Sequence, residues 1–361
     1  MAESVYIHIP FCKSKCKYCS FVSFPNTEKI TGYLFSLFKE IDVHYEGEPL
    51  KTLYFGGGTP SLLPIDFVKK IISKFNLLPD CEITFEFNPD DCDIEYLKNL
   101  RDFGINRLSL GSQSFNNNLL EIIGRRHNSE DILKAIDTAK KAGFENINID
   151  LIYGLPNQTM EILKNDLYII SKLDIQHVST YGLKIEEGSY FYSNYPQSLP
   201  NDDLQADMYL EINKYLENLG YKRYEISNFA KNGYESKHNL TYWDNAEYYG
   251  FGVAAHGYIN GIRYSNYTTL EEYMNSPSTH ECGHFLTDKE KLEEEIFLGF
   301  RRTSGIDISK INQKYGIDFN NKYKTTLDKY SPQFIIKTQS GWTLSTEGVL
   351  LSNNILSEFL E

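Results

Sequence analysis

Short apolar runs alternate with longer helical patterns along the first half of the chain. Two of the helices have clear ends: one begins after Asn128 and closes at Gly143, and another is capped by Asp93 and closed by Gly104. Strands that alternate with helices in this way are typical of a parallel sheet built from βα units. We predict six strands, at Val5–Ile9, Thr52–Phe55, Ile83–Phe87, Arg107–Gly111, Asn146–Ile152 and His177–Leu183.

Several of these strands have one apolar face and one polar face. In the third strand, Thr84 and Glu86 lie opposite the apolar residues. A doubly wound sheet is covered on both faces, so its strands would be almost entirely apolar. Polar groups near the strand ends instead favour an α/β fold with a partial (β/α)6 barrel and a wet lumen; a sheet with one solvated face is the alternative. The polar faces of the other strands carry Tyr6, His8, Ser109, Gly111, Gln113, Asn148 and Asp150.

The βα rhythm stops after Leu183. A helix is predicted around Asp202–Leu219, and the segment Tyr221–Asn266 is rich in Gly, Asn and Tyr. Another charged helix begins near Asp288, and the remaining residues read as short helices with a hairpin at Ser340–Gly341. We therefore expect three parts: a core barrel over 1–200, an extension over 201–285, and a small C-terminal α+β, winged-helix-like domain over 286–361.

The composition restricts the classes of partner. The 361 residues include 36 basic and 49 acidic side chains, for a net charge of −13, with no basic run. This balance argues against a nucleic-acid or anionic-membrane surface. No apolar stretch is long enough to span a membrane, and Met1–Ile9 lacks the basic and apolar regions of a signal peptide. We expect a cytoplasmic protein.

Three of the six cysteines crowd together as Cys12, Cys16 and Cys19, with C-x3-C-x2-C spacing. A tight cysteine cluster in a chain of this kind favours a metal site over disulfides. Three thiolates on a 4Fe–4S cluster would leave one iron open to an outside ligand. A zinc site with His8 as fourth ligand is the alternative. The scattered cysteines, which we interpret as small buried or incidental residues, are Cys81, Cys92 and Cys282.

The run Phe11–Cys19 and the string Gly56–Pro60 (GGGTP) together resemble the radical-SAM superfamily. The resemblance implies that S-adenosylmethionine (SAM) binds the open iron of the cluster. It places the backbone of Tyr18 at the adenine, and the glycine-rich stretch with Gly57, Gly58 and Thr59 at the methionyl amino group. The alternative for the glycines is an ordinary tight turn.

Longer strings resemble the oxygen-independent coproporphyrinogen III oxidase family, which includes haem-chaperone relatives, over nearly the whole chain. These strings are Tyr6–Cys12 (YIHIPFC), Phe55–Leu62 (FGGGTPSL), Gly111–Phe115 (GSQSF) and Asp150–Pro156 (DLIYGLP). The resemblance implies that five side chains contact SAM, namely Tyr6, Glu86, Gln113, Arg125 and Asp150. The alternative for each of them is a buried structural hydrogen bond or ion pair.

Two features favour the haem-chaperone branch over the oxidase. Phe21 stands where the oxidase has a further cysteine, and the first predicted strand begins almost at once, without the oxidase's N-terminal extension. The string His238–Trp243 (HNxxYW), followed by Gly252–Gly257 (GVAAHG), resembles that branch. Imidazoles bind haem iron and aromatic rings suit a porphyrin face, so His238 is the first haem candidate and His256 the second. A hydrogen-bonded structural role is the alternative for His238.

The resemblance implies a chaperone that carries a cluster, SAM and haem, and delivers haem to an acceptor protein. It also implies a reductant protein for the cluster and peripheral membrane contact through the acceptor. We assign no catalytic residue. The alternative function is radical-SAM oxidative decarboxylation of coproporphyrinogen III, for which we expect no activity. A group formed by His280, Cys282 and His284 has metal-ligand residue types but no counterpart in the family.

Overall fold

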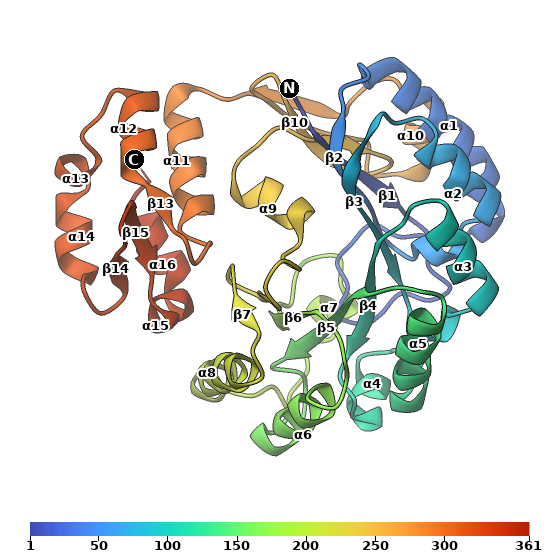
Figure 1. Ribbon diagram of the computed structural model, residues 1–361, viewed down its shortest axis with the longest axis horizontal. Coiled ribbons are helices and arrows are strands. Elements are labelled where there is room, and N and C mark those ends of the chain that lie inside the picture. Colours follow the sequence, from blue (N-terminus) through green and yellow to red (C-terminus); the bar gives the residue numbers. More distant parts are fainter. Residues whose placement is uncertain (361) are drawn as a thin grey trace.

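In the computed structural model, which describes residues 1–360, a nine-stranded sheet curves into an open barrel (Figure 1). The strands run in the order β7-β8-β6-β5-β4-β3-β2-β1-β9. The first six strands of the chain pair in parallel with their sequence neighbours, which confirms the predicted βα organisation. They are β1 (Ser4–Ile9), β2 (Leu50–Gly57), β3 (Leu77–Phe87), β4 (Arg107–Gln113), β5 (Asn146–Tyr153) and β6 (His177–Gly182).

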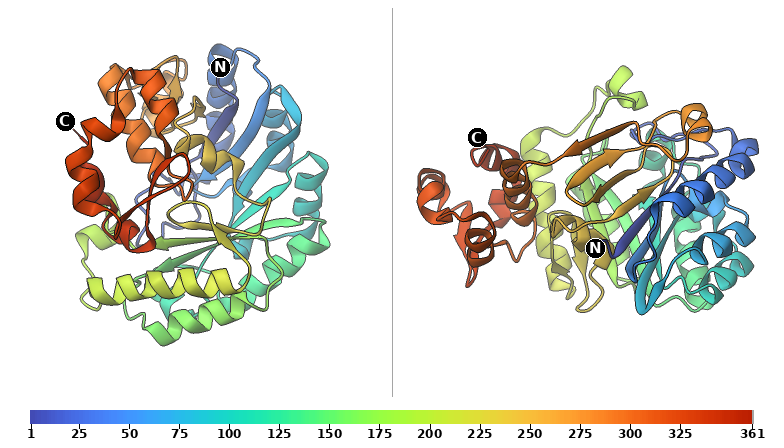
Figure 2. Two further views of the ribbon diagram at one scale, coloured as in Figure 1. Left: turned by 60° about the vertical axis from the view of Figure 1, so that its left-hand side comes forward. Right: turned by 90° about the horizontal axis from the view of Figure 1, so that it is seen from above.

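Helices cover the outer face of the curved sheet (Figures 1 and 2). The predicted helix ends are confirmed, because the side chain of Asn128 caps α5 together with Asp131, and Asp93 accepts a hydrogen bond from the backbone N–H of Tyr96. The apolar strand faces are buried beneath these helices. The fold is therefore α/β, a partial barrel with its polar face inward. The covering helices are α1 (Ile30–His44), α2 (Ile65–Ile72), α3 (Ile94–Asp102), α4 (Asn117–Ile122), α5 (Ser129–Lys141), α6 (Met160–Ile170) and α8 (Asp202–Asn218).

The extension contributes strands to both edges of the sheet, which the sequence did not predict. β8 (Asn228–Ala230) pairs antiparallel with β6, and β7 (Lys222–Arg223) pairs with β8. At the opposite edge, β9 (Tyr249–Phe251) pairs in parallel with β1. Between these edge strands, α9 (Lys237–Trp243) packs against β2.

A second, three-stranded antiparallel sheet follows β9. It consists of β10 (His256–Ile259), β11 (Ile262–Ser265) and β12 (Cys282–Phe285), with α10 (Leu270–Asn275) between the last two strands. β10 begins only five residues after β9, so this sheet lies near the β1 edge of the barrel. Two further short elements, α7 (Tyr190–Ser193) and the turn at Pro60–Leu62, lie in loops that follow strand ends.

The C-terminal residues form a helical module with its own hydrophobic core and a small sheet of order β13-β15-β14. The predicted hairpin at Ser340–Gly341 is confirmed as the turn that joins β14 to β15. None of the helices in residues 1–360 is long and apolar enough to cross a membrane. The elements are α11 (Asp288–Gly299), β13 (Ile306–Asp307), α12 (Ile308–Tyr315), α13 (Phe319–Lys322), α14 (Lys324–Tyr330), β14 (Ile335–Lys337), β15 (Gly341–Leu344), α15 (Thr346–Leu350) and α16 (Ser352–Ser357).

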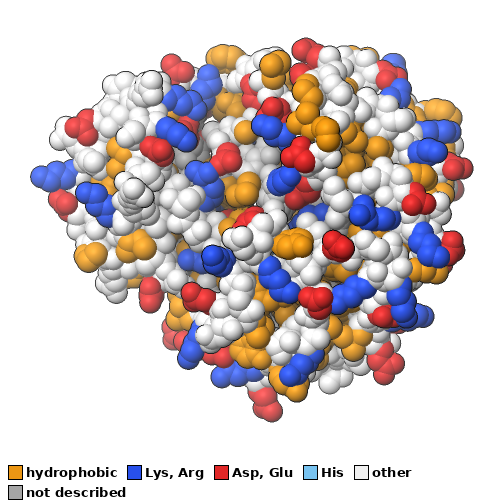
Figure 3. Space-filling view, viewed as in Figure 1, with side chains coloured by type: hydrophobic (Ala, Val, Ile, Leu, Met, Phe, Trp, Pro, Cys, Tyr) orange, Lys and Arg blue, Asp and Glu red, His pale blue; other side chains and the backbone are white. Residues whose placement is uncertain are grey.

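Charged side chains of both signs mix on the surface. On the face shown in Figure 3, Lys and Arg side chains are interspersed with Asp and Glu side chains and do not gather into one patch. This agrees with the absence of a basic run in the sequence.

Candidate functional site

The cysteine loop leaves the C-terminal end of β1 and is tied to the barrel by backbone hydrogen bonds. The N–H of Cys12 donates to the carbonyl of Phe24 at 3.1 Å, and the N–H of Lys17 donates to the carbonyl of Ile123 at 2.9 Å. All three thiols, on Cys12, Cys16 and Cys19, are partly buried. The loop therefore holds its sulfur atoms at the mouth of the barrel, where binding sites of such barrels lie.

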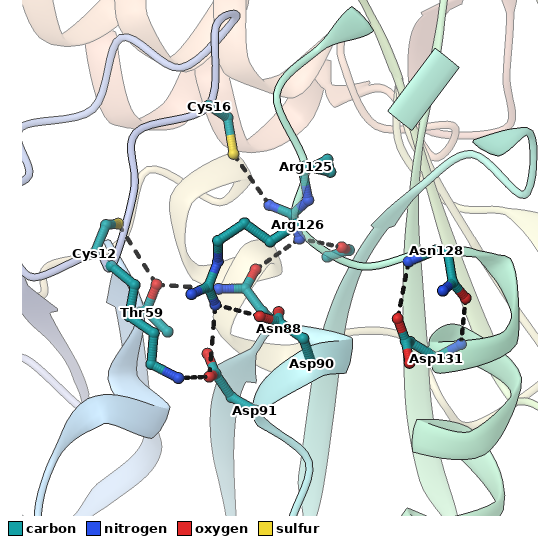
Figure 4. A network of polar contacts seen from close by, with 12 residues as sticks. Cys12, Cys16, Thr59, Asn88, Asp90, Asp91, Arg125, Arg126, Asn128 and Asp131 are labelled. Carbon is teal, nitrogen blue, oxygen red and sulfur yellow. Dashed lines mark hydrogen bonds and ion pairs between the residues drawn. The ribbon is translucent and has the colours of Figure 1, made fainter. Parts of the chain in front are cut away.

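A chain of hydrogen bonds connects two of the thiols across this mouth (Figure 4). The Thr59 hydroxyl donates to Sγ of Cys12 at 3.5 Å, and Nδ2 of Asn88 donates to the Thr59 hydroxyl at 3.1 Å. Arg125 closes the chain, because Nη2 donates to Oδ1 of Asn88 at 2.6 Å and Nη1 donates to Sγ of Cys16 at 3.4 Å. Both sulfur atoms therefore meet a donor at the barrel mouth.

Asn88 is a site residue that the sequence analysis missed. It directly follows the last residue of β3, as Thr59 follows the end of β2. Because the C-terminal ends of parallel strands meet at one face of a barrel, its position in the string Phe87-Asn88-Pro89 was the available signal.

The donor set fits an iron–sulfur cluster better than a single zinc ion. A zinc ion needs its ligands within roughly 2.3 Å of one point, whereas each cysteine of a cubane binds a different iron. In residues 1–360, no group of three or more His, Cys, Asp or Glu side chains converges as such an ion requires. His8 is also engaged: Nδ1 lies 3.0 Å from the Tyr6 hydroxyl, and Nε2 lies 3.0 Å from the carbonyl oxygen of Val22. The zinc alternative is therefore disfavoured.

Burial and the neighbouring thiols raise the pKa of Cys19 to about 11. The free thiol consequently stays protonated at neutral pH. A bound cation lowers the pKa of a coordinating thiol, so loading a cluster would release its proton.

The glycine-rich string packs directly against the base of the cysteine loop. Gly57 has a φ of +106°, and a Cβ there would lie 2.7 Å from the His8 ring. A Cβ on Gly58 would lie 2.6 Å from the carbonyl oxygen of Phe11. Larger residues would push the glycine-rich loop away from the cysteine loop. The glycines are therefore needed for the close packing of the two backbones as well as for a turn.

Two half-buried carboxylates of the lumen lie beneath the cysteine loop. The Tyr54 hydroxyl donates to Oε1 of Glu86 at 2.6 Å, and Nδ2 of Asn148 donates to Oδ1 of Asp150 at 2.8 Å. Burial raises the pKa of Glu86 to about 7, with the bond from Tyr54 opposing the shift and the charge of Asp150 adding to it. Burial also raises the pKa of Asp150. Such carboxylates can accept hydrogen bonds from hydroxyls or attract a cationic ligand.

Gln113 ends β4 in a strained conformation above the same lumen. Its φ is +64°, in the left-handed region, and its Oε1 is buried with no hydrogen-bond partner in residues 1–360. A Cβ on Gly111 would lie 3.3 Å from the Gln113 amide and 3.1 Å from Arg125, so both side chains lie over Gly111. Buried Asp166 holds the two residues that follow Gln113 in place. It accepts hydrogen bonds from the Ser114 hydroxyl at 2.7 Å and from the Phe115 N–H at 2.9 Å. The unpaired Oε1 leaves an acceptor for an external donor.

Tyr6 and Tyr18, the two remaining SAM candidates, also line this region. The Tyr6 hydroxyl bonds His8, as described above. Burial raises the pKa of Tyr18, and the nearby charge of Arg125 opposes the shift. The structure thus brings the predicted SAM residues to the barrel mouth and lumen beside the cysteines.

His238 lies in the same lumen, deeper than the cysteine loop, with its ring 6.5 Å from the ring of Tyr6. It is 1% exposed on α9, with Nδ1 2.8 Å from the Thr52 hydroxyl and Nε2 2.7 Å from the Tyr242 hydroxyl. Its ring stacks on Tyr54 with centroids 4.9 Å apart. Thr52 lies near the N-terminal end of β2, whereas the cysteine loop follows the C-terminal end of β1. Because both ring nitrogens are occupied, this geometry favours the structural alternative for His238.

His256 is exposed as the first residue of β10. Its backbone carbonyl packs against Gly250 of β9, at the β1 edge of the barrel. In residues 1–360 its ring forms no hydrogen bond, so it stays available to a ligand.

The group formed by His280, Cys282 and His284 does not converge on a point. His280 stacks on Tyr264 at 4.0 Å and bonds Asn266, whereas His284 lies 2.9 Å from Glu290. These residues therefore do not form one metal site.

Comparisons with known proteins agree with this geometry. Residues 6–167 match the radical SAM superfamily, and residues 286–351 match the HemN C-terminal domain. Over 99% of its length the chain is 40% identical to the heme chaperone HemW of Lactococcus lactis subsp. lactis, covering 97% of that protein. It is 39% identical to the heme chaperone HemW of Bacillus subtilis, with 99% of each chain covered.

A solved structure is also similar over the full length. Coproporphyrinogen III oxidase (HemN) from Escherichia coli, described as a radical SAM enzyme, superposes with a TM-score of 0.86 at 25% identity. The match covers 99% of this chain and 89% of that chain.

Proposed function

The chain belongs to the haem-chaperone HemW family of radical-SAM proteins, and from that premise we propose that it binds haem and delivers it to an acceptor protein. The full-length similarity to two proteins named heme chaperone HemW, at 40% and 39% identity, carries this proposal. Phe21 at the position of the oxidase's further cysteine supports it.

We propose that Cys12, Cys16 and Cys19 hold three irons of a 4Fe–4S cluster. Thr59 and Arg125 then stabilise two of the thiolates through the donors described above. When bound, the cluster supplies the electron that cleaves the sulfonium of SAM. The C-x3-C-x2-C loop leaves one iron for that ligand.

The SAM contacts remain those expected from the resemblance. Glu86 and Asp150 present carboxylate oxygens to the lumen, and Gln113 presents an unpaired amide oxygen. These acceptors suit the hydroxyl and amino donors of SAM, and Arg125 suits its carboxylate. The other proposed contacts are Tyr6, Tyr18, Gly57, Gly58 and Thr59.

We divide the chain into a core over 1–200, an extension over 201–285 and a C-terminal domain over 286–361. A reductant protein would reduce the cluster, and the acceptor would bring any membrane contact. The haem-contact roles of His238 and His256 and the cytoplasmic location stay predictions.

Haemin titration of the reconstituted protein tests the proposal. Purified protein with a full cluster is mixed with haemin, and the Soret band is followed by absorbance. We expect a shifted Soret band that saturates at micromolar haemin. Absence of any Soret change in that range would overturn the haem-chaperone function.

The structural likeness to HemN favours one second candidate, oxidative decarboxylation of coproporphyrinogen III. An anaerobic assay with SAM, reductant and porphyrinogen separates the two functions. We expect no protoporphyrinogen. Product formed with turnover would establish the oxidase instead.

A further inference from the structure

The amide of Asn88 lies between two side chains that each donate a hydrogen bond to a cysteine sulfur (Figure 4). Its Nδ2 lies 3.1 Å from the Thr59 hydroxyl, and its Oδ1 lies 2.6 Å from Nη2 of Arg125. The hydroxyl is 3.5 Å from Sγ of Cys12, and Nη1 of Arg125 is 3.4 Å from Sγ of Cys16. One side chain outside the cysteine loop therefore contacts both of these donors.

Arg125 determines which way the Asn88 amide faces. A guanidinium can only donate hydrogen bonds, so the amide atom beside Arg125 must be the carbonyl oxygen. The amide NH2 group then faces Thr59, to which it can only donate. The Thr59 oxygen accepts that bond, which leaves the hydroxyl hydrogen free to point at the Cys12 sulfur. The three bonds that join Arg125, Asn88, Thr59 and Cys12 thus run in one direction, and we call this series the Asn88 relay.

The turn that carries Asn88 is fixed to the loops around it. The backbone N–H of Asp91 donates to the carbonyl of Asn88 at 3.0 Å, and the carboxylate of Asp91 pairs with Lys13 of the cysteine loop. Arg126 pairs with Asp90 in the same turn. The amide is therefore held in place by its surroundings, as groups that orient metal ligands usually are.

The two donors depend on Asn88 to different degrees. Nη2 of Arg125 also donates to the carbonyl of Gly111, so the guanidinium keeps an anchor without Asn88. Thr59 is only 3% exposed, and among the described residues its hydroxyl bonds only Asn88 and Cys12. A change of Asn88 should therefore affect the bond to the Cys12 sulfur and leave the bond from Arg125 to Cys16.

We propose that Asn88 is a positioning residue for the cluster, which turns the Thr59 hydroxyl hydrogen onto the Cys12 sulfur and so favours the reduced state. Hydrogen bonds to the sulfurs of a cluster stabilise added negative charge and raise its reduction potential. This role rests on the proposed cluster, and it belongs to a residue that is neither a ligand nor one of the proposed SAM contacts.

Asn88→Asp reverses the relay with almost no change of shape. A carboxylate still accepts from Arg125, but it can only accept from Thr59, so the hydroxyl hydrogen turns away from Cys12. The new negative charge would by itself hinder reduction of the cluster. The informative quantity is therefore the effect of Thr59→Val in two backgrounds, which a double-mutant cycle isolates from that charge.

A redox titration followed by electron paramagnetic resonance gives the ratio of reduced to oxidised cluster at one fixed potential. In the wild-type background we expect Thr59→Val to lower this ratio about two- to tenfold. In the Asn88→Asp background we expect Thr59→Val to have no further effect. The matched control is Asn99→Asp, which adds the same charge at an exposed position of α3 and should keep the full effect of Thr59→Val.

Resonance Raman spectra in H2O and D2O give a readout that does not depend on the potential. An exchangeable hydrogen bonded to a thiolate shifts the iron–thiolate stretching bands when deuterium replaces it. We expect Thr59→Val and Asn88→Asp to lose the same component of this shift. Retention of that component in Asn88→Asp would contradict the reversed hydroxyl.

The outcomes separate the relay from the cluster. Wild-type protein that takes up no cluster would overturn the cluster and the relay together. If the cluster forms, the positioning role alone is overturned when Thr59→Val has no effect in the wild-type background, or when it keeps its full effect in Asn88→Asp.

Asn88→Ala gives a second comparison if Asn88→Asp loads the cluster poorly. The Thr59 hydroxyl can then rotate freely, so the effect of Thr59→Val on the ratio should shrink. An undiminished effect in this background would overturn the positioning role. A cluster lost from both Asn88 variants but kept in Thr59→Val would also overturn it, because Asn88 would then act on more than this one bond.

Discussion

The hydroxyl of Tyr54 on β2 donates a 2.6 Å hydrogen bond to Glu86 on the neighbouring strand β3, and the ring of Tyr54 stacks on His238. Tyr54 therefore contacts both the proposed SAM residue Glu86 and the helix α9, which carries His238. Its bond stabilises the charged form of a carboxylate that burial would otherwise neutralise.

We predict that SAM affinity falls as pH drops through about 7, because Glu86 has a pKa of about 7 and accepts hydrogen bonds best when ionised. Tyr54→Phe removes the bond that lowers this pKa, so the fall should begin at higher pH. Equilibrium dialysis of SAM against reconstituted protein from pH 6 to 9 measures both profiles. Glu86→Gln should remove this step, and an unchanged profile in Glu86→Gln would contradict the assignment.

Loss of a lumen hydrogen bond should weaken SAM without removing the cluster. Asp150→Ala and Gln113→Ala should each cost roughly 1.5–3 kcal/mol, or about a tenfold to hundredfold rise in the SAM dissociation constant. Iron content and visible absorbance should match wild type, since neither residue is a cluster ligand. A SAM dissociation constant unchanged in fully loaded Asp150→Ala protein would exclude the proposed contact.

Each cysteine of the loop should be essential for the cluster. Replacing Cys12, Cys16 or Cys19 with Ala should abolish the brown thiolate-to-iron absorbance and SAM cleavage. The matched controls are alanine variants of Cys81, Cys92 and Cys282, which should keep both properties. Normal absorbance in Cys16→Ala would refute the ligand set.

Thr59 should tune the cluster through its bond to Cys12. Thr59→Val removes a donor to sulfur, and donors to cluster sulfurs raise the reduction potential. A hydrogen bond of about 0.5–1.5 kcal/mol corresponds to a fall of roughly 20–65 mV for one electron. A redox titration followed by electron paramagnetic resonance measures the reduction potential of the cluster. Thr59→Ser keeps the hydroxyl and should have the wild-type potential.

His238 should contribute strongly to stability. His238→Ala leaves the hydroxyls of Thr52 and Tyr242 without their partner and opens a void beside Tyr54, at a cost of about 2–4 kcal/mol in unfolding free energy. Urea denaturation measures the change. Lys237→Ala, on the exposed side of the same helix, should change it by less than about 0.5 kcal/mol.

Local pattern was enough to predict the barrel. Residues such as Ile83, Thr84 and Glu86 alternate strictly, and caps such as Asn128 act within one turn of chain, so both signals are readable without tertiary information. Edge strands β8 and β9 have only three residues each, too few to alternate, and they form because distant partners exist.

The residues that the structure gathers at the barrel mouth could be predicted where family strings mark them, as at Cys12, Gln113 and Asp150. The environment of His238 could not be predicted, because its partner Thr52 lies 186 positions earlier in the chain. Asn88 was missed for a similar reason. Its contacts with Thr59 and Arg125 appear only when the ends of neighbouring strands meet.

The pairing of β1 with β9 has a consequence for how the protein is made. Val5 to Ile7 pair with Tyr249 to Phe251, so a growing chain on the ribosome carries an unpaired β1 edge until those late residues emerge. Exposed edges of this kind invite pairing with other chains. The nascent barrel therefore needs protection over most of its synthesis, and premature termination before residue 249 should yield an aggregation-prone fragment.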